Sequence, residues 1–226
     1  MSRIAESIGR LTESLPSGVT VVAVTKTRTP EEAQEAYNAG LRIFGENRVQ
    51  EMVSKKAKLP ADISWHLIGH LQSNKVKQAV SAASMIESVD TLRLLHMIDA
   101  EAVAQGRSID CLLQVHIASE ETKSGFSVDE AEETDWTAVS RALKAARICG
   151  LMGMATFTDD REKVRAEFRR LRELFSRMRD SHFTGSRQFR EISMGMSGDW
   201  QVAIEEGSTM IRVGTLIFGE RLNKAR

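Results

Sequence analysis

The chain has 226 residues, of which 42% are hydrophobic and 27% are charged, as in ordinary soluble globular proteins. Its 31 basic and 31 acidic side chains cancel, so the composition favours neither a nucleic acid nor a membrane as a partner. Because the N-terminal segment has no signal-peptide core and no apolar run approaches about 18 residues, we expect a cytoplasmic protein.

Strand-like and helix-like segments alternate along the chain after an amphipathic N-terminal helix. Apolar, β-branched runs predict eight strands, at residues 19–26, 41–47, 63–69, 84–89, 109–117, 147–155, 189–194 and 208–215. Amphipathic segments between them predict helices at residues 30–40, 47–59, 71–81, 90–106, 136–146, 159–180 and 197–207, with a last helical turn after the eighth strand.

Eight strand–helix units predict an α/β fold, a closed (β/α)₈ TIM barrel, as one domain over residues 1–226. An open doubly wound sheet is the alternative. That alternative is disfavoured as a dinucleotide-binding fold, because no GxGxxG fingerprint follows the first strand.

Functional residues of such barrels gather where strands end and the following loops begin. Lys26 ends the first, strongly apolar strand, and partial desolvation there disfavours its ammonium form and favours the neutral amine that imine formation needs. The plainer interpretation is a lysine that reaches solvent. The other candidates at strand ends are Glu46, Asn47, Ser88, Lys123, Met154, Ser193, Met194 and residues 212–215.

The loops after strands seven and eight resemble the place where barrels often bind phosphate, through backbone N–H groups and a short helix. Gly214 allows close approach of an anion, and Thr215 and Ser193 carry hydroxyl donors. Glycines at these positions are equally consistent with tight turns alone. Arg212 shares a strand face with Met210, so it lies inside a barrel and needs either a bound ligand or an internal carboxylate.

Three further features carry less functional signal. His66 and His70 span a strand end and a loop without a carboxylate motif, so no metal site is predicted. Cys111 and Cys149 are expected to be buried free thiols rather than a disulfide. Lys123 is either a solvated charge or faces an anionic ligand.

The ordered motifs of the chain resemble the pyridoxal phosphate homeostasis protein family, single-domain relatives of the alanine racemase N-terminal barrel. The resemblance extends from about residue 19 to residue 221. It rests on VAVTKTRTPEEAQEAYNAG, FGENRVQE, WHLIGHLQSNK, EETKSGF, GLMGMA and SMGMSGDWQVAIEEGSTMIRVGTLIFGER. Two departures are His116, where an asparagine is usual, and residues 155–157, where a proline-containing segment is more familiar.

The resemblance implies pyridoxal 5'-phosphate (PLP) as the cofactor, held as a Schiff base on Lys26. It also implies that Asn47 lies beside the ring and that Arg212 faces the pyridine nitrogen. Around the phosphate it implies Ser193, Met194, Gly214 and Thr215. Because arginine only donates hydrogen bonds, it favours an unprotonated ring nitrogen and weakens carbanion stabilisation.

The function expected from the resemblance is a non-catalytic PLP binder in PLP homeostasis, monomeric, with PLP-dependent apo-enzymes as possible acceptors. A PLP-dependent amino-acid racemase is the alternative. Alanine racemases use a tyrosine from an additional domain of a partner subunit as the second base, whereas this barrel leaves no residues for that domain. The one tyrosine, Tyr37, is expected on the barrel exterior. A third hypothesis is a barrel enzyme that acts on another phosphorylated ligand through Lys26.

Overall fold

The computed structural model describes residues 2–119 and 124–220. Eight parallel strands pair in chain order, and β1 pairs with β8, which closes the sheet into a barrel. The predicted α/β barrel is therefore confirmed. The strands are β1 (Thr20–Val24), β2 (Ile43–Glu46), β3 (Ser64–Leu67), β4 (Met85–Val89), β5 (Ile109–Val115), β6 (Ala146–Gly153), β7 (Glu191–Ser193) and β8 (Met210–Val213).

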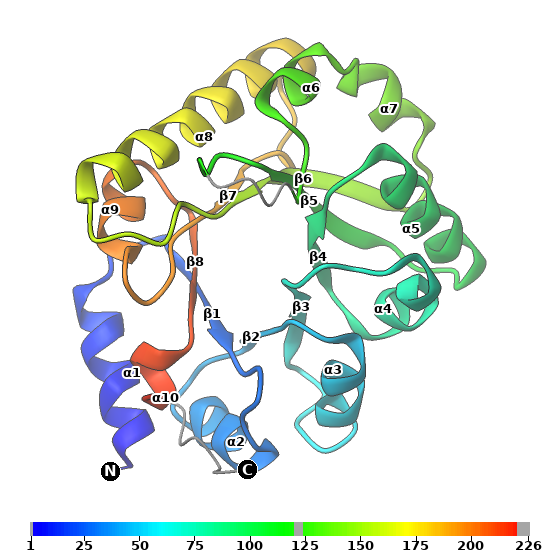
Figure 1. Ribbon diagram of the computed structural model, residues 1–226. Helices are drawn as coiled ribbons and strands as arrows, with labels where there is room; N and C mark the ends of the chain where they lie inside the picture. The colour runs from blue at the N-terminus through cyan, green and yellow to red at the C-terminus, as the bar shows by residue number, and fades with distance from the viewer. Residues whose placement is uncertain (1, 120–123, 221–226) are drawn as a thin grey trace.

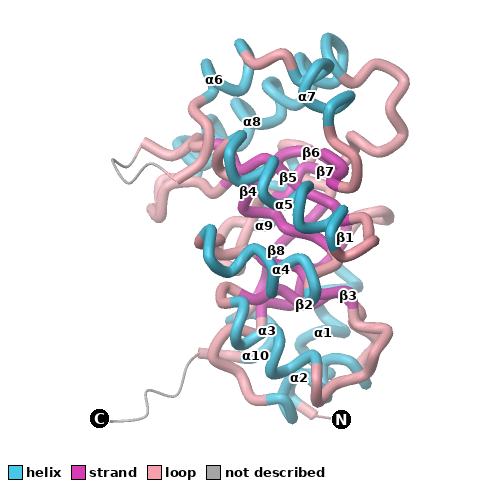
Figure 2. Tube along the Cα trace, turned by 90° about the vertical axis from the view of Figure 1, so that its right-hand side faces the viewer, coloured by secondary structure: helices cyan, strands magenta, loops and turns pink. Residues whose placement is uncertain are grey.

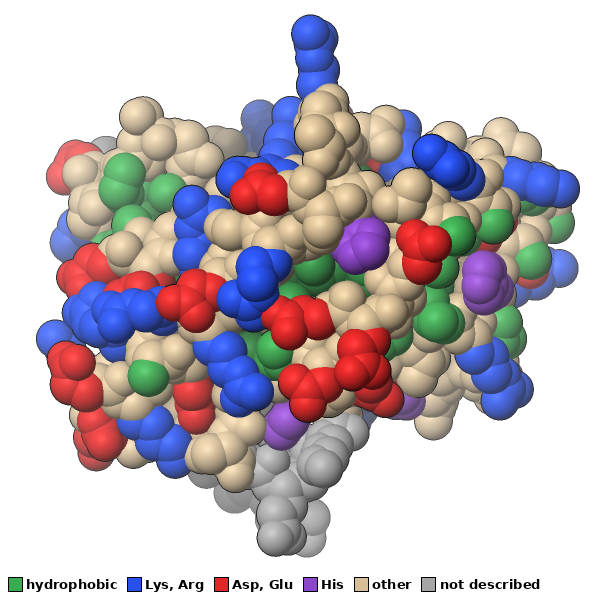
Figure 3. Space-filling view, turned by 90° about the horizontal axis from the view of Figure 1, so that it is seen from above, with side chains coloured by type: hydrophobic (Ala, Val, Ile, Leu, Met, Phe, Trp, Pro, Cys, Tyr) green, Lys and Arg blue, Asp and Glu red, His purple; other side chains and the backbone are tan. Residues whose placement is uncertain are grey.

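Helices surround the strands on the outside of the barrel, as Figures 1 and 2 show. Among the described residues they are α1 (Arg3–Ser14), α2 (Pro30–Asn38), α3 (Val49–Lys56), α4 (Val76–Ala82), α5 (Leu92–Ala104), α6 (Val128–Glu133), α7 (Trp136–Ala142), α8 (Arg161–His182), α9 (Trp200–Glu205) and α10 (Thr215–Phe218). A 3₁₀ turn, η1 (Ser73–Lys75), precedes α4. Side chains of both charges are interspersed over the face shown in Figure 3, in keeping with the zero net charge.

Local sequence signals set where several helices begin. Thr29 and Glu32 form a reciprocal capping box at the start of α2, with Pro30 in the first helical position. In α8, Asp160 accepts hydrogen bonds from the first turn of the helix. The apolar face predicted for α8 is buried against the barrel at Val164, Phe168, Leu171, Phe175 and Met178.

The barrel has two apolar layers. The larger core lies between strands and helices, whereas a smaller cluster fills the barrel interior. That interior cluster consists of Val22, Met85, Leu112, Cys149, Met152 and Met210. The next inward positions along β4 and β8 are two residues further toward the C-terminal ends of these strands, at Glu87 and Arg212. The interior therefore changes from apolar to charged on the way to the barrel mouth.

The helix predicted over residues 136–146 is too long, because α7 ends at Ala142 and Ala146 already begins β6. The cause is Asp99 of α5. Its Oδ1 accepts hydrogen bonds from the backbone N–H groups of Lys144, Ala145 and Ala146, at 2.9, 2.7 and 2.8 Å. These bonds hold the segment in an extended path into β6.

We expect Asp99→Asn to lower the free energy of unfolding by about 1–3 kcal/mol at neutral pH, because it removes the charge that these three bonds use. Burial favours the protonated form, but the three backbone hydrogen bonds outweigh it and lower the pKa of Asp99. A lowered pKa stabilises the fold above the unfolded value of about 3.9, and this contribution is lost as the pH falls through the folded value. Urea unfolding at neutral pH and at about pH 3 tests this, since the difference between the two proteins should shrink in acid.

Both cysteines are buried free thiols, as predicted. Cys111 belongs to the layer between strands and helices, and Cys149 lies in the barrel interior. Burial raises the pKa of Cys149 to about 12 and that of Cys111 well above its usual value, so neither thiol is ionised at neutral pH. Within the described part of the chain, no helix has the length and hydrophobicity to cross a membrane.

Candidate functional site

Lys26 follows β1 at the C-terminal end of the barrel, where its side chain is half-buried. Side chains alternate along the strand, and Val22 belongs to the interior cluster. The same alternation places Val24 on the inner side, and Lys26 follows two residues later, beyond the end of the strand. The structure therefore brings Lys26 to the barrel mouth.

The end of β8 lies directly beside the end of β1. Ala23 pairs with Val213, and Val24 and Gly214 are the residues that follow this last pair. A Cβ added to Gly214 would lie 3.2 Å from the carbonyl oxygen of Val24 and 3.4 Å from its Cβ. The absence of a side chain at Gly214 thus lets the ends of β1 and β8 approach closely, near Lys26.

A serine from the loop after β7, Ser197, contacts the residues that follow β8. The Oγ of Ser197 accepts hydrogen bonds from the N–H groups of Gly214 and Leu216, at 3.2 and 3.3 Å. Thr215, between these two residues, is exposed. We call Ser197 and residues 214–216 the phosphate turn. The hydroxyls of Ser197 and Thr215 are donors of the kind that bind phosphate oxygens, whereas the N–H groups of Gly214 and Leu216 are bound to Ser197.

Below the mouth, four polar side chains form an interior network of Arg212, Glu87, Ser193 and His66. Arg212 donates to the Ser193 Oγ at 2.6 Å and to the Gly153 carbonyl at 2.9 Å, and it lies 3.8 Å from a Glu87 oxygen. Glu87 accepts the Ser193 hydroxyl at 2.6 Å and lies 2.7 Å from the His66 Nδ1. The internal carboxylate that Arg212 requires is therefore Glu87.

The charges of this network support one another. Burial favours protonation of Glu87, but the hydrogen bond and charge of His66, with the charge of Arg212, outweigh it and lower the pKa of Glu87. Burial lowers the pKa of Arg212, against the opposing charges of Glu87 and Asp199. Arginine starts from so high a pKa that it stays cationic. A fixed cation with a compensating anion thus lies beneath the mouth.

Asn47 and Ser88 lie at neighbouring strand ends. Asn47 directly follows β2 and is half-buried, and its backbone packs so tightly on Gly69 that no Cβ fits there. Ser88 is buried and donates to the Gly69 carbonyl at 2.6 Å. The structure therefore uses Gly69 to bring the ends of β2, β3 and β4 together and leaves Asn47 at the rim.

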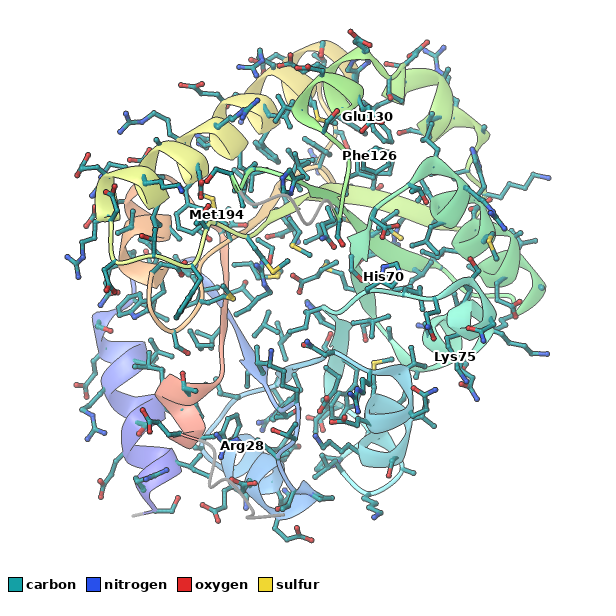
Figure 4. All side chains as sticks on the ribbon, in the orientation of Figure 1. Arg28, His70, Lys75, Phe126, Glu130 and Met194 are labelled. Atoms are coloured by element: carbon teal, nitrogen blue, oxygen red, sulfur yellow. The ribbon has the colours of Figure 1, made fainter. Side chains whose placement is uncertain are left out.

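Two residues predicted at the phosphate have their side chains elsewhere. The Ser193 hydroxyl belongs to the interior network, and Met194 is fully buried in the layer between strands and helices. Figure 4 shows Met194 on the side that α8 and α9 cover. Met154 is exposed. Lys123 lies outside the described residues.

The two histidines considered for a metal bind separate carboxylates. His66 is buried against Glu87, whereas the exposed His70 lies 3.0 Å from Asp90 at the rim near β3 and β4 (Figure 4). Within residues 2–119 and 124–220, no group of three or more histidine, cysteine or acidic side chains could hold a metal.

Sequence reasoning missed Glu87 and Ser197. A signal existed for each residue. Glu87 is the one charged residue in the apolar strand SMIESV, and Ser197 lies between two glycines in SMGMSGDW. A buried charge in a strand usually has a partner across the interior, and a serine in a glycine-rich loop after a barrel strand is a hydroxyl donor for anions.

The chain is similar to a family of known barrels. The model of the alanine racemase N-terminal domain family matches residues 1–222. A pyridoxal phosphate homeostasis protein of Aquifex aeolicus is 38% identical, in an alignment that covers 98% of this chain and 96% of that protein.

Solved structures give the same result. PipY of Synechococcus elongatus with PLP bound has a TM-score of 0.87 and 37% identity, and the match covers 96% of this chain and 100% of that chain. An alanine racemase of Clostridium difficile has a TM-score of 0.74 at 13% identity. That match covers 98% of this chain and 57% of the racemase, and it shows a shared fold alone.

Proposed function

The chain belongs to the alanine racemase N-terminal domain family, among the pyridoxal phosphate homeostasis proteins, and we propose that it holds PLP at its barrel mouth as a Schiff base on Lys26. The observation that carries this proposal is the meeting of β1 and β8, which puts Lys26 and the phosphate turn at one opening. An amine that can react with the aldehyde and hydroxyl donors for the phosphate thus lie at the same end of the barrel.

The residues present fit the cofactor. Gly214 lets the ends of β1 and β8 approach closely, since a Cβ there would lie 3.2 Å from the Val24 carbonyl oxygen. Ser197, whose oxygen holds the N–H groups of Gly214 and Leu216, has a hydroxyl hydrogen to donate to a phosphate oxygen, and Thr215 adds an exposed hydroxyl. Asn47 lies at the same rim and is proposed to contact the ring. Ser193 and Met194 are then proposed to take part through the backbone of their loop, since their side chains are buried.

We expect Ser197→Ala to raise the dissociation constant for PLP about ten- to a hundredfold, because a hydrogen bond to a charged group contributes about 1.5–3 kcal/mol. Equilibrium titration of the absorbance measures this. Ser181→Ala, an exposed serine of α8, is the matched control and should bind as the wild type does. Equal affinities for Ser197→Ala and the control would remove Ser197 from the site.

Arg212 bears on what the cofactor does when bound. Bound PLP supplies an electrophilic aldehyde and, when its ring nitrogen is protonated, an electron sink. We propose that Arg212 faces that nitrogen. Arg212 can only donate hydrogen bonds, and Ser193, Gly153 and Glu87 hold its guanidinium in place. It therefore favours the unprotonated nitrogen and a site that binds PLP without strong carbanion chemistry.

The position of the tyrosine also disfavours a racemase, which needs a second base at the barrel mouth. The single tyrosine, Tyr37, is on α2 outside the barrel, where its hydroxyl donates to Asp62 at 2.8 Å. It is thus unavailable as a second base at the mouth. We propose that the protein is a PLP carrier without substantial catalysis, which holds the cofactor and releases it to PLP-dependent apo-enzymes.

The decisive experiment is to incubate the purified protein with PLP and record its absorption spectrum before and after borohydride. We expect a yellow adduct that borohydride bleaches, and mass spectrometry of the reduced protein should place the label on Lys26. A protein that stays colourless refutes the proposal. Incubation with L-alanine in D₂O tests the racemase, since rapid α-deuteration and D-alanine formation would overturn the non-catalytic role.

The oligomeric state and the cellular location of the protein are further predictions. We propose a monomer that acts in the cytoplasm. Light scattering coupled to size-exclusion chromatography measures the mass directly, and a value near 25.1 kDa is the expected result.

A further inference from the structure

Lys26 lies in a tight turn whose conformation is unusual. The N–H of Arg28 donates to the carbonyl of Thr25 at 2.9 Å, so Lys26 and Thr27 are the two central residues of a four-residue turn. Thr27 has a φ of +65°, and it is the one residue other than glycine with positive φ in the described part of the chain. Positive φ at this place in a turn favours glycine or asparagine, and a β-branched residue there is strained.

Groups from β2 and α3 hold this turn from one side. The carboxylate of Glu51 accepts the Thr27 N–H at 3.1 Å. The Nζ of Lys55 donates to the Thr25 carbonyl at 2.5 Å and to Glu46 Oε1 at the same distance. Thus the peptide groups on both sides of Lys26 are bound by side chains of another element.

The ion pair between Glu46 and Lys55, which contacts the start of the turn, is buried. Glu46 is fully buried and Lys55 nearly so, and the Thr25 hydroxyl donates to Glu46 Oε1 at 2.6 Å. The second carboxylate oxygen, Oε2, has no hydrogen-bond partner among the described residues. A buried ion pair with an unsatisfied oxygen is costly to keep, so stability alone does not explain it. Its direct contacts are with the residue before Lys26.

The other side of the turn reaches the end of α10. The Arg28 guanidinium donates to the carbonyl of Gly219 and lies 5.6 Å from the centre of the Phe218 ring. Figure 4 shows Arg28 between α2 and α10. Because α10 begins in the phosphate turn, the same four residues connect the lysine to the place proposed for the phosphate.

We infer that Glu51, Lys55 and Glu46 are positioning residues that hold the strained Thr25–Arg28 turn, so that Lys26 is pre-set for its bond to the PLP aldehyde. This inference rests on the proposed function. The physical reason is that a flexible lysine must be ordered when the bond forms, and a turn fixed beforehand lowers that cost. Such residues affect the covalent bond and leave binding of the phosphate unchanged.

Two ligands separate these contributions. PLP carries the aldehyde, whereas pyridoxine 5'-phosphate has an alcohol instead and binds without a covalent bond. We expect Glu51→Ala to raise the dissociation constant for PLP about five- to tenfold and to leave that for pyridoxine 5'-phosphate unchanged. Glu51→Gln keeps an oxygen that accepts the Thr27 N–H, so it should bind PLP nearly as the wild type does.

A rescue tests the turn itself. Glycine adopts positive φ without strain, so Thr27→Gly in the Glu51→Ala background should restore most of the affinity for PLP. Glu51 is partly exposed, and its variants should unfold at nearly the wild-type temperature. The inference fails if Glu51→Ala binds PLP normally, if both ligands weaken equally, or if Thr27→Gly restores nothing. A wild type that binds both ligands without any borohydride-reducible adduct contradicts the proposed function instead.

Discussion

Lys26→Ala is expected to abolish the borohydride-reducible adduct and to raise the dissociation constant for PLP at least about a hundredfold, equivalent to about 2.7 kcal/mol. Only the contacts of the phosphate turn, Asn47 and Arg212 would then hold the cofactor. Because Lys26 lies at the mouth outside both apolar layers, the ligand-free variant should unfold at nearly the wild-type temperature. Absorbance titration and thermal unfolding measure the two effects.

A matched control excludes unspecific reaction of PLP with lysines. Lys58 is exposed beside α3, and Lys58→Ala removes a similar amine without touching the mouth. It should keep both the adduct and the affinity. A yellow, reducible Lys26→Ala protein would place the covalent bond on another residue and would overturn the role of Lys26.

Glu87→Gln is expected to lower the free energy of unfolding by about 3–5 kcal/mol, because it removes the counter-charge that lies nearest to the buried Arg212 cation. Glu87 has no exposed surface, and Arg212 is 4% exposed, so water cannot compensate. Urea unfolding at neutral pH measures the change. The exposed Glu35→Gln on α2 is the control and should change stability by less than about 0.5 kcal/mol.

A double variant separates the charge effect from a packing defect. Glu87→Leu alone should be strongly destabilising, whereas Glu87→Leu with Arg212→Met removes both charges and should regain part of the loss, since apolar pairs often replace buried ion pairs well. A double variant that is no more stable than Glu87→Leu would mean that the two side chains are not coupled.

The barrel could be predicted from the sequence because most strands carry a buried apolar run and most of the helices that follow them carry an apolar stripe. These patterns are local. The same is true of the family, whose motifs are contiguous stretches of the amino-acid sequence and whose membership is confirmed. The helix α6 was nevertheless missed, although Ser127 and Glu130 form a capping box at its start. Its six residues are too short for periodicity to show.

The candidate site was predictable only in part. Alternation along β8 placed Arg212 inside the barrel, and the strand order placed Lys26 and Gly214 at the same end. The partner of Arg212 was not predictable, because contacts across a closed barrel depend on the stagger of strands distant in sequence. For the same reason, the residues that hold the Lys26 turn, from β2 and α3, emerge only in three dimensions.

The loop after β7 shows a second reason why the site could not be fully predicted from the sequence. Ser193 and Ser197 both lie in the motif SMGMSGDW, and either could contact a phosphate. Alternation decides the direction of a side chain only within a strand, and β7 ends at Ser193. Beyond it, Gly195 has a φ of +96°, which turns the chain and lets Ser197 reach the N–H groups of residues 214–216.

The interior network implies that substitutions in this protein cause two kinds of defect, loss of the folded protein or loss of cofactor binding alone. Arg212 on β8 is bonded to residues of β6 and β7 and faces Glu87 of β4, so it braces four strands from inside. Substitution of Arg212 should therefore reduce the amount of protein in a cell, because unfolded copies are removed by proteases. Substitution of Lys26 should leave protein levels normal and remove only the cofactor. Immunoblots would thus distinguish the two classes without a binding measurement.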